Sequence, residues 1–179
     1  MREFIPINAE SDIPAAYAAG PIGDLLRFNN LDRPLPEIQQ AKLLIGMCMD
    51  YRKHLRIPDN FAYIIRAGGA NLRYSEFKVS YAIAVGGVEA IALMGHTRCG
   101  MVNLMARKEA FIAGLAEKAG WDREAAERHF THFAPMFEIG DEADFVLSEA
   151  KRLRERYPRI TVAPLMYKVE DNRLYALAE

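Results

Sequence analysis

Continuous apolar runs alternate with amphipathic segments through the middle of this 179-residue chain. The runs at residues 42–48, 61–65 and 89–94 predict strands, and their unbroken apolar character indicates strands covered on both faces, as in parallel sheets. Apolar residues at helical spacing predict helices at residues 75–85 and from Cys99 to about Lys118. Strands that alternate with helices in this way indicate an α/β fold, with a mostly parallel central sheet flanked by helices on both faces.

The two ends of the chain follow other patterns. Residues 122–137 and 141–157 predict two more helices, and residues 160–169 and 173–177 predict a strand, a turn and a returning strand. Residues 1–40 contain five prolines, which exclude a long helix there. We therefore expect one α/β domain over residues 1–179, in which residues 1–40 form an N-terminal arm that packs on the domain or on a second subunit.

Composition excludes several classes of function. The formal net charge of −1 gives no electrostatic reason to expect a nucleic-acid partner. No apolar run approaches the roughly 18 to 20 residues that span a bilayer, and the N-terminus lacks the features of a secretory signal, so we expect no membrane partner. Two cysteines are too few for a disulfide framework, which favours a soluble protein in the reducing cytoplasm.

Both cysteines lie where predicted strands end. Cys48 follows the first apolar run, and His96 and Cys99 follow the third. Ligands of α/β sheets bind beyond the carboxyl ends of the strands, so these side chains and the glycine loop at residues 66–71 are expected at one edge. Two thiolates and an imidazole are suitable ligands for one zinc ion (Zn²⁺) and leave a fourth position open, as in catalytic sites. A Cys48–Cys99 disulfide is the alternative. A helix beginning at Cys99 would favour its thiolate.

Asp50 and Arg52 follow the first proposed ligand. Residues two apart in an extended loop point to the same side, so this carboxylate and guanidinium can pair. A carboxylate held close to a zinc-bound water can accept its proton and orient the resulting hydroxide. Two alternatives stay open: a loop ion pair of small energetic worth, and an Asp50 that coordinates zinc directly and closes the site.

Three motifs together resemble the signature of the β-class carbonic anhydrases: Cys48-x-Asp50-x-Arg52, Arg66-Ala67-Gly68-Gly69 and His96-x-x-Cys99-Gly100. The resemblance is specific over residues 45–103 and looser over residues 160–177, and it does not cover the arm or the phenylalanine-rich segment 122–137. It implies four parallel strands with an added antiparallel edge strand, and a homodimer or higher oligomer. It also implies zinc held by Cys48, His96 and Cys99, with water or hydroxide as fourth ligand, and Asp50, oriented by Arg52, as the gate residue.

The function that the resemblance implies is the zinc-dependent, reversible hydration of carbon dioxide to bicarbonate. The physical chemistry agrees, because zinc makes hydroxide available at neutral pH. Tyr51 and Arg98 depart from the family pattern and bear on rate and substrate. One alternative is a hydrolase of carbonyl sulfide or carbon disulfide on the same scaffold, with Tyr51 narrowing the pocket. Another is a non-catalytic zinc-binding dimer closed by Asp50. In any dimer, the arm and the Phe130-Phe133-Phe137 face are expected to be partly buried between subunits.

Overall fold

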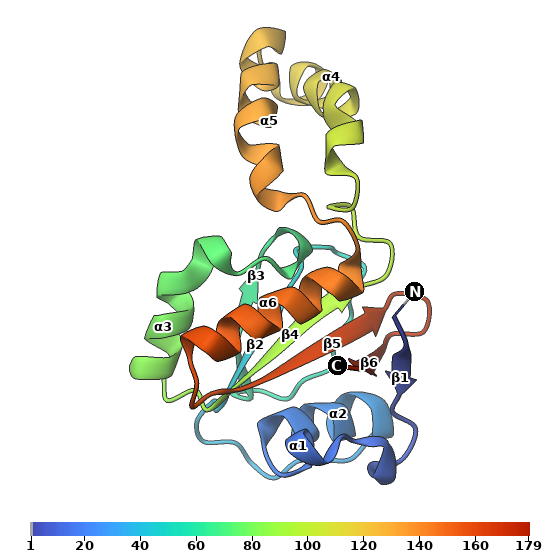
Figure 1. The fold of residues 1–179 in the computed structure, drawn as a ribbon, viewed down its shortest axis with the longest axis vertical. Coiled ribbons are helices and arrows are strands. Elements are labelled where there is room, and N and C mark those ends of the chain that lie inside the picture. The colour runs from blue at the N-terminus through green and yellow to red at the C-terminus, as the bar shows by residue number, and fades with distance from the viewer. Residues whose placement is uncertain (1) are drawn as a thin grey trace.

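A six-stranded sheet organises the chain, whose computed structural model describes residues 2–179 (Figure 1). The strand order is β1-β6-β5-β4-β2-β3. The strands β3, β2, β4 and β5 are parallel, and β6 is antiparallel to β5, which confirms the predicted mostly parallel α/β sheet. The bounds are β1 (Phe4–Pro6), β2 (Leu43–Met47), β3 (Ala62–Arg66), β4 (Ala90–His96), β5 (Thr161–Lys168) and β6 (Arg173–Leu177).

The strand β1 was not predicted. It pairs antiparallel with β6, with Phe4 opposite Leu177 and Pro6 opposite Tyr175, so β1 and not β6 is the outer strand on that side. Proline is tolerated in an edge strand because its missing N–H is not needed by a second neighbour. A strand of three residues that ends in proline carries too little periodicity to be recognised from sequence.

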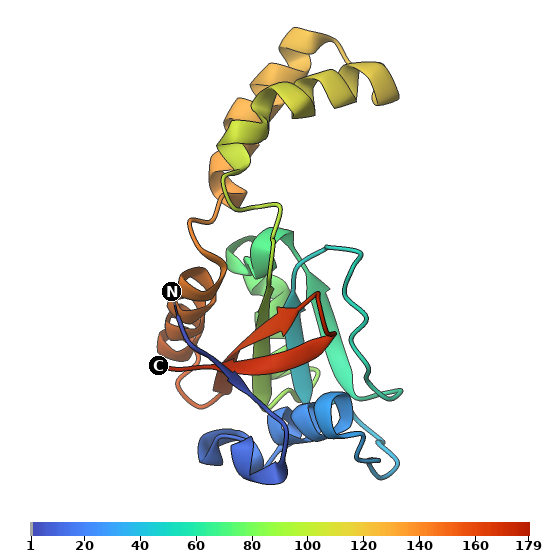
Figure 2. The same ribbon diagram turned by 90° about the vertical axis from the view of Figure 1, so that its right-hand side faces the viewer.

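Helices cover both faces of the sheet (Figures 1 and 2). Leu43, Ile45 and Met47 of β2 pack in one cluster with residues of α2, whereas Leu44 packs in another with residues of α3 and α6. Successive residues of a strand point to opposite faces, so the unbroken apolar run in β2 reflects burial on both. The helices are α1 (Ala15–Ala18), α2 (Pro21–Leu31), α3 (Glu76–Ala84), α4 (Lys108–Ala119), α5 (Arg123–Phe137) and α6 (Glu142–Arg156).

The N-terminal arm packs on the sheet of its own chain. Ile7, Leu25 and Leu26 are completely buried in the cluster beneath the sheet. The buried Asn30 of α2 donates from Nδ2 to the Leu174 carbonyl at 2.7 Å and accepts from the Leu174 N–H at 3.0 Å, which joins α2 to β6. Of the two arrangements expected for the arm, the described residues show the one within the domain.

The helices α4 and α5 form a hairpin that stands off from the sheet (Figures 1 and 2). The helix predicted from Cys99 is wrong at its start: a 3-10 turn spans Leu104–Arg107, and α4 begins at Lys108. The backbone between Cys99 and Leu104 is not helical, because Val102 forms a β-bridge with Ile139 and Asn103 has a left-handed φ of 52°. No helix within residues 2–179 has both the length and the apolar character needed to cross a bilayer.

Candidate metal centre

Cys48, His96 and Cys99 come together at the carboxyl ends of two neighbouring strands. Cys48 follows β2, His96 is the last residue of β4, and Cys99 lies in the turn beyond it. One ligand atom from each residue lies within 4.8 Å of those of the other two. The three residues are buried, with 3%, 1% and 5% of their surfaces exposed. The structure therefore brings the three predicted ligands into one cluster.

The imidazole of His96 is oriented as a metal ligand would be. Its Nδ1 lies 3.0 Å from the Thr97 carbonyl oxygen, which can only accept, so Nδ1 carries the proton and Nε2 presents a lone pair. Within the described residues, Nε2 is buried and has no hydrogen-bond partner. A buried acceptor without a partner is unfavourable, and metal-binding histidines typically donate their other N–H to a carbonyl or carboxylate. This lone pair and two cysteine sulfurs fit a zinc ion.

Both cysteines are free, so the alternative of a Cys48–Cys99 disulfide is not formed. The neighbouring Cys99 thiol lowers the pKa of Cys48, whereas the proximity of Cys48, together with burial, raises the pKa of Cys99. The pair of sulfurs therefore favours a thiolate in this buried position. Lys53, which the sequence did not single out, is buried and donates to the Cys48 carbonyl at 3.2 Å.

The glycine loop after β3 reaches the first sulfur. The Gly69 N–H points to the Cys48 Sγ at 3.4 Å. Gly69 has a φ of +63°, and a Cβ there would lie 3.2 Å from the side chain of Ile139. Arg66 of the same loop approaches the Cys48 and Asp50 carbonyls with Nη1, at 3.4 Å each. Glycine at position 69 therefore allows the backbone to come close to the thiolate.

Cys99 does not lie at a helix N-terminus, so the predicted support from a helix dipole is wrong. Its backbone N–H donates instead to Glu142 Oε1 at 3.0 Å, in the first turn of α6. Sequence reasoning missed Glu142, because an acidic residue in a first helical turn is common for its interaction with the dipole. No local pattern connects it to a turn 43 positions away.

Asp50 and Arg52 form the predicted pair. Arg52 donates from Nε to Oδ1 at 2.9 Å and from Nη2 to Oδ2 at 2.7 Å, and its backbone N–H also donates to Oδ1. Hydrogen bonding to the guanidinium holds the pKa of Asp50 well below its usual range. Oδ2 lies 3.9 Å from His96 Nε2, so an ionised carboxylate faces the three candidate ligands.

The two departures from the family pattern point away from this cluster. The Tyr51 side chain is directed to solvent, with 88% of the residue exposed, so its ring does not narrow the site within one chain. Arg98 is exposed and pairs with Glu170 at 2.9 Å, while its carbonyl accepts from Arg52 Nη2 at 2.9 Å. Arg98 thus contributes its backbone, and not its charge, to the Asp50–Arg52 pair.

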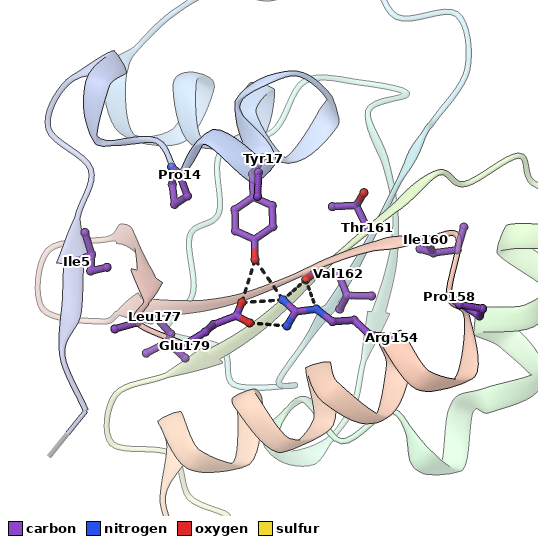
Figure 3. Close-up of a pocket in the computed structure, with 12 residues that line it drawn as sticks. Ile5, Pro14, Tyr17, Arg154, Pro158, Ile160, Thr161, Val162, Leu177 and Glu179 are labelled. Atoms are coloured by element: carbon purple, nitrogen blue, oxygen red, sulfur yellow. Dashed lines mark hydrogen bonds and ion pairs between the residues drawn. The ribbon is translucent and has the colours of Figure 1, made fainter.

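A pocket of about 720 Å³ lies at the start of β5, at the opposite end of this strand from the candidate metal centre (Figure 3). Its polar groups are occupied with one another: Arg154 pairs with Glu179 and donates to the Val162 carbonyl, and the Tyr17 hydroxyl donates to Glu179 at 2.9 Å. Burial is the main cause that raises the pKa of Tyr17 to about 12. Arg154, Tyr17 and Glu179 thus bind one another and stabilise the end of the chain.

Comparison with known proteins defines the fold. No protein-family model matches the chain, and no curated protein matches its sequence. Solved structures do match. The β-carbonic anhydrase isoform I of Trichomonas vaginalis superposes with a TM-score of 0.64 at 21% identity, over 83% of this chain and 90% of that chain. The carbonic anhydrase of Glaciozyma antarctica gives 0.62 at 18% identity, over 93% and 100%.

A third similar structure is the apo form of a carbon disulfide hydrolase, with a TM-score of 0.55 at 21% identity, over 76% of this chain and 78% of that chain. At these identities the similarity is one of fold. The chain has the β-carbonic anhydrase fold. It also contains the buried Cys-His-Cys triad that is typical of zinc sites in that family.

Proposed function

We propose that this protein is a zinc enzyme, a carbonic anhydrase that reversibly hydrates carbon dioxide to bicarbonate, with Cys48, His96 and Cys99 as the zinc ligands. The observation that carries the proposal is the buried, unpartnered Nε2 of His96, which shares one small space with both cysteine sulfurs. The fold shared with β-carbonic anhydrases supports the same function.

The residues divide the chemistry between them. Cys48, His96 and Cys99 would hold the zinc ion, which would act as a Lewis acid and lower the pKa of a bound water to about 7. Asp50 presents Oδ2 as a hydrogen-bond acceptor facing that space, and its low pKa keeps it ionised at neutral pH. Arg52 binds both carboxylate oxygens and so holds Oδ2 in one direction. We therefore assign Asp50 and Arg52 to catalysis.

Hydrolysis of carbon disulfide or carbonyl sulfide is the second candidate. A carbon disulfide hydrolase is as similar in sequence to this chain as the Trichomonas enzyme is, at 21% identity. Both reactions use the same proposed groups, because each adds the elements of water to a linear cumulated carbon. The third candidate is a non-catalytic zinc site closed by Asp50. Its carboxylate oxygen Oδ2 lies 3.9 Å from His96 Nε2, close enough to reach a metal ion after a small side-chain rotation.

Turnover of the zinc-loaded protein separates these candidates. We expect carbon dioxide hydration, followed by stopped-flow with a pH indicator, at a rate at least about 1,000-fold above that of the uncatalysed reaction. Carbon disulfide consumption is measured in parallel. Chelator-treated protein is the control and should fall to the background rate. Hydration no faster than in buffer would reject the leading proposal, and turnover of carbon disulfide alone would favour the second candidate.

We also propose that the protein is a cytoplasmic homodimer or higher homo-oligomer. Free cysteines suit a reducing compartment. Large apolar side chains are exposed along one edge of the sheet: Tyr63 and Ile64 on the outer strand β3, Phe77 and Tyr81 on α3, and Val85 directly after α3. An exposed strand edge beside large apolar side chains is typical of an interface. Phe130, by contrast, is buried within its own chain. The prediction that Phe130 lies between subunits is therefore wrong.

The variant Phe77→Lys/Tyr81→Lys tests this interface. We expect the unchanged protein to sediment as a dimer or larger species at micromolar concentration, and the variant to sediment as a monomer, because two charges would be buried against a partner. Thr131→Lys, on the exposed face of α5, is the matched control and should leave the assembly unchanged. A monomeric profile of the unchanged protein would contradict the proposal.

A further inference from the structure

The phenylalanine-rich helix α5, which lies outside the family resemblance, lines an apolar cavity that is partly open to solvent, since Met49 and Phe133 at its rim are exposed. Phe130, Phe133 and Phe137 line a space of about 310 Å³ at the base of the α4–α5 hairpin, with Phe111 on the α4 side. Among the residues that line it, His129 has the only polar side chain, and its ring packs 4.8 Å from that of Phe133. The cavity therefore offers aromatic surface and almost no hydrogen bonding.

The opposite wall belongs to the loops that carry the metal-site residues. It is formed by Met49, next to Cys48, by Gly68 and by Met101. Met101 also packs against the buried cluster that contains Cys48 and Cys99. A Cβ at Gly68 would lie 3.0 Å from the Met101 Sδ, so the glycine leaves room for this thioether. One side chain, Met101, thus contacts both the cavity and the candidate metal centre.

The volume and the apolar lining of the cavity limit the size and the polarity of the ligand that it can bind. A volume of about 310 Å³ is at the lower end of the range found for small-molecule sites, which is about 300 to 1,000 Å³. Enclosed cavities lined by Leu and Phe bind benzene or xenon, and the buried Phe130 and Ala134 give the inner wall of this open cavity the same apolar character. A charged molecule would lose its hydration there without gaining a partner. Thioether and aromatic walls suit uncharged, polarisable molecules.

We infer that this cavity is a binding site for small, uncharged, apolar molecules up to the size of an aromatic ring. A molecule bound there lies against Met101, one side chain away from Cys48 and Cys99. Binding depends on the walls of the cavity and not on a metal ion. The inference therefore goes beyond the proposed function, and it stands or falls separately from the hydration of carbon dioxide.

Xenon-129 NMR of the purified full-length protein tests this site, with benzene as competitor and benzoate as its charged counterpart. We expect xenon to bind, benzene to displace it and benzoate to leave it bound. Ala134 is buried in the cavity wall, so Ala134→Met should fill the space and weaken xenon binding at least tenfold. Thr131→Met adds the same side chain to the exposed face of α5 and should bind xenon like the unchanged protein.

Three outcomes would overturn the inference. The first is equal xenon binding by Ala134→Met and Thr131→Met. The second is displacement by benzoate as effective as that by benzene. The third is binding only at dilutions at which the chain is monomeric, since a second copy would then be the occupant. Circular dichroism checks folding, and Leu104→Phe replaces Ala134→Met as the filling variant if that protein does not fold.

Discussion

The Cys48→Ser variant is expected to lose its zinc. A serine hydroxyl remains protonated at neutral pH and is a poor zinc ligand, whereas the neighbouring Cys99 lowers the pKa of the Cys48 thiol. We expect the metal content, measured by mass spectrometry after dialysis, to fall from about one zinc per chain to below about one tenth. The loss should be the largest effect of any single substitution on metal binding.

The matched control for Cys48→Ser keeps the number of thiols constant. Ser148 is an exposed serine of α6, so the double variant Cys48→Ser/Ser148→Cys has two cysteines but lacks the cluster. It should bind as little zinc as the single variant. Unchanged zinc content in Cys48→Ser would show that Cys48 is not a zinc ligand and would disprove the assignment of the metal site. Restored zinc in the double variant would show that exposed thiols bind the metal without this geometry.

The Asp50→Asn variant is expected to keep its zinc and lose its activity. The amide has nearly the shape of the carboxylate but carries no charge and has only one acceptor oxygen, so it loses the ion pair with Arg52 and a hydrogen-bond acceptor at the site. We expect kcat/KM for carbon dioxide hydration to fall about 100-fold, the upper end of the usual loss when a group that orients a metal-bound ligand is removed. Metal analysis of the same samples checks that zinc is retained.

The control and the pH dependence sharpen the test of Asp50. Asp59→Asn changes an exposed carboxylate and should be fully active. Because Asp50 has a depressed pKa, it is ionised above its folded-state pKa and protonates only as the pH falls through that low value. A midpoint of activity near neutral pH therefore belongs to another group. If Asp50→Asn hydrates carbon dioxide as fast as the unchanged protein does, the proposed role of Asp50 is wrong.

Local pattern was sufficient for the central strands and for the clustering of the three candidate ligands. The apolar runs that become β2 and β4 are continuous, and the rule that ligands bind at carboxyl ends places Cys48 and His96 together. The Asp50–Arg52 pair also follows from residues two apart. These features depend on neighbours in sequence or on the general geometry of parallel sheets.

Long-range contacts explain what the sequence did not reveal. The segment after Cys99 has helical periodicity, but its backbone pairs with Ile139, more than thirty positions away, and so begins α4 late. Glu142 reaches the Cys99 N–H only because α6 packs beside β4. Met101 contacts both the cavity and the candidate metal centre because the base of the α4–α5 hairpin lies against the loops after β2 and β3. No local sequence pattern indicates this contact.

The candidate metal site forms only when β2 and β4 pair in the correct register, because Cys48 follows β2 and His96 ends β4. Met47 lies opposite Met94, and the ligands follow directly from these positions. A slip of one residue would shift Cys48 by about 3.3 Å along the strand and turn every side chain of β2 to the opposite face. Only the correctly aligned sheet can assemble both sulfurs and the imidazole. Metal uptake during refolding should therefore report when these two strands have found their native partners, independently of any catalytic assay.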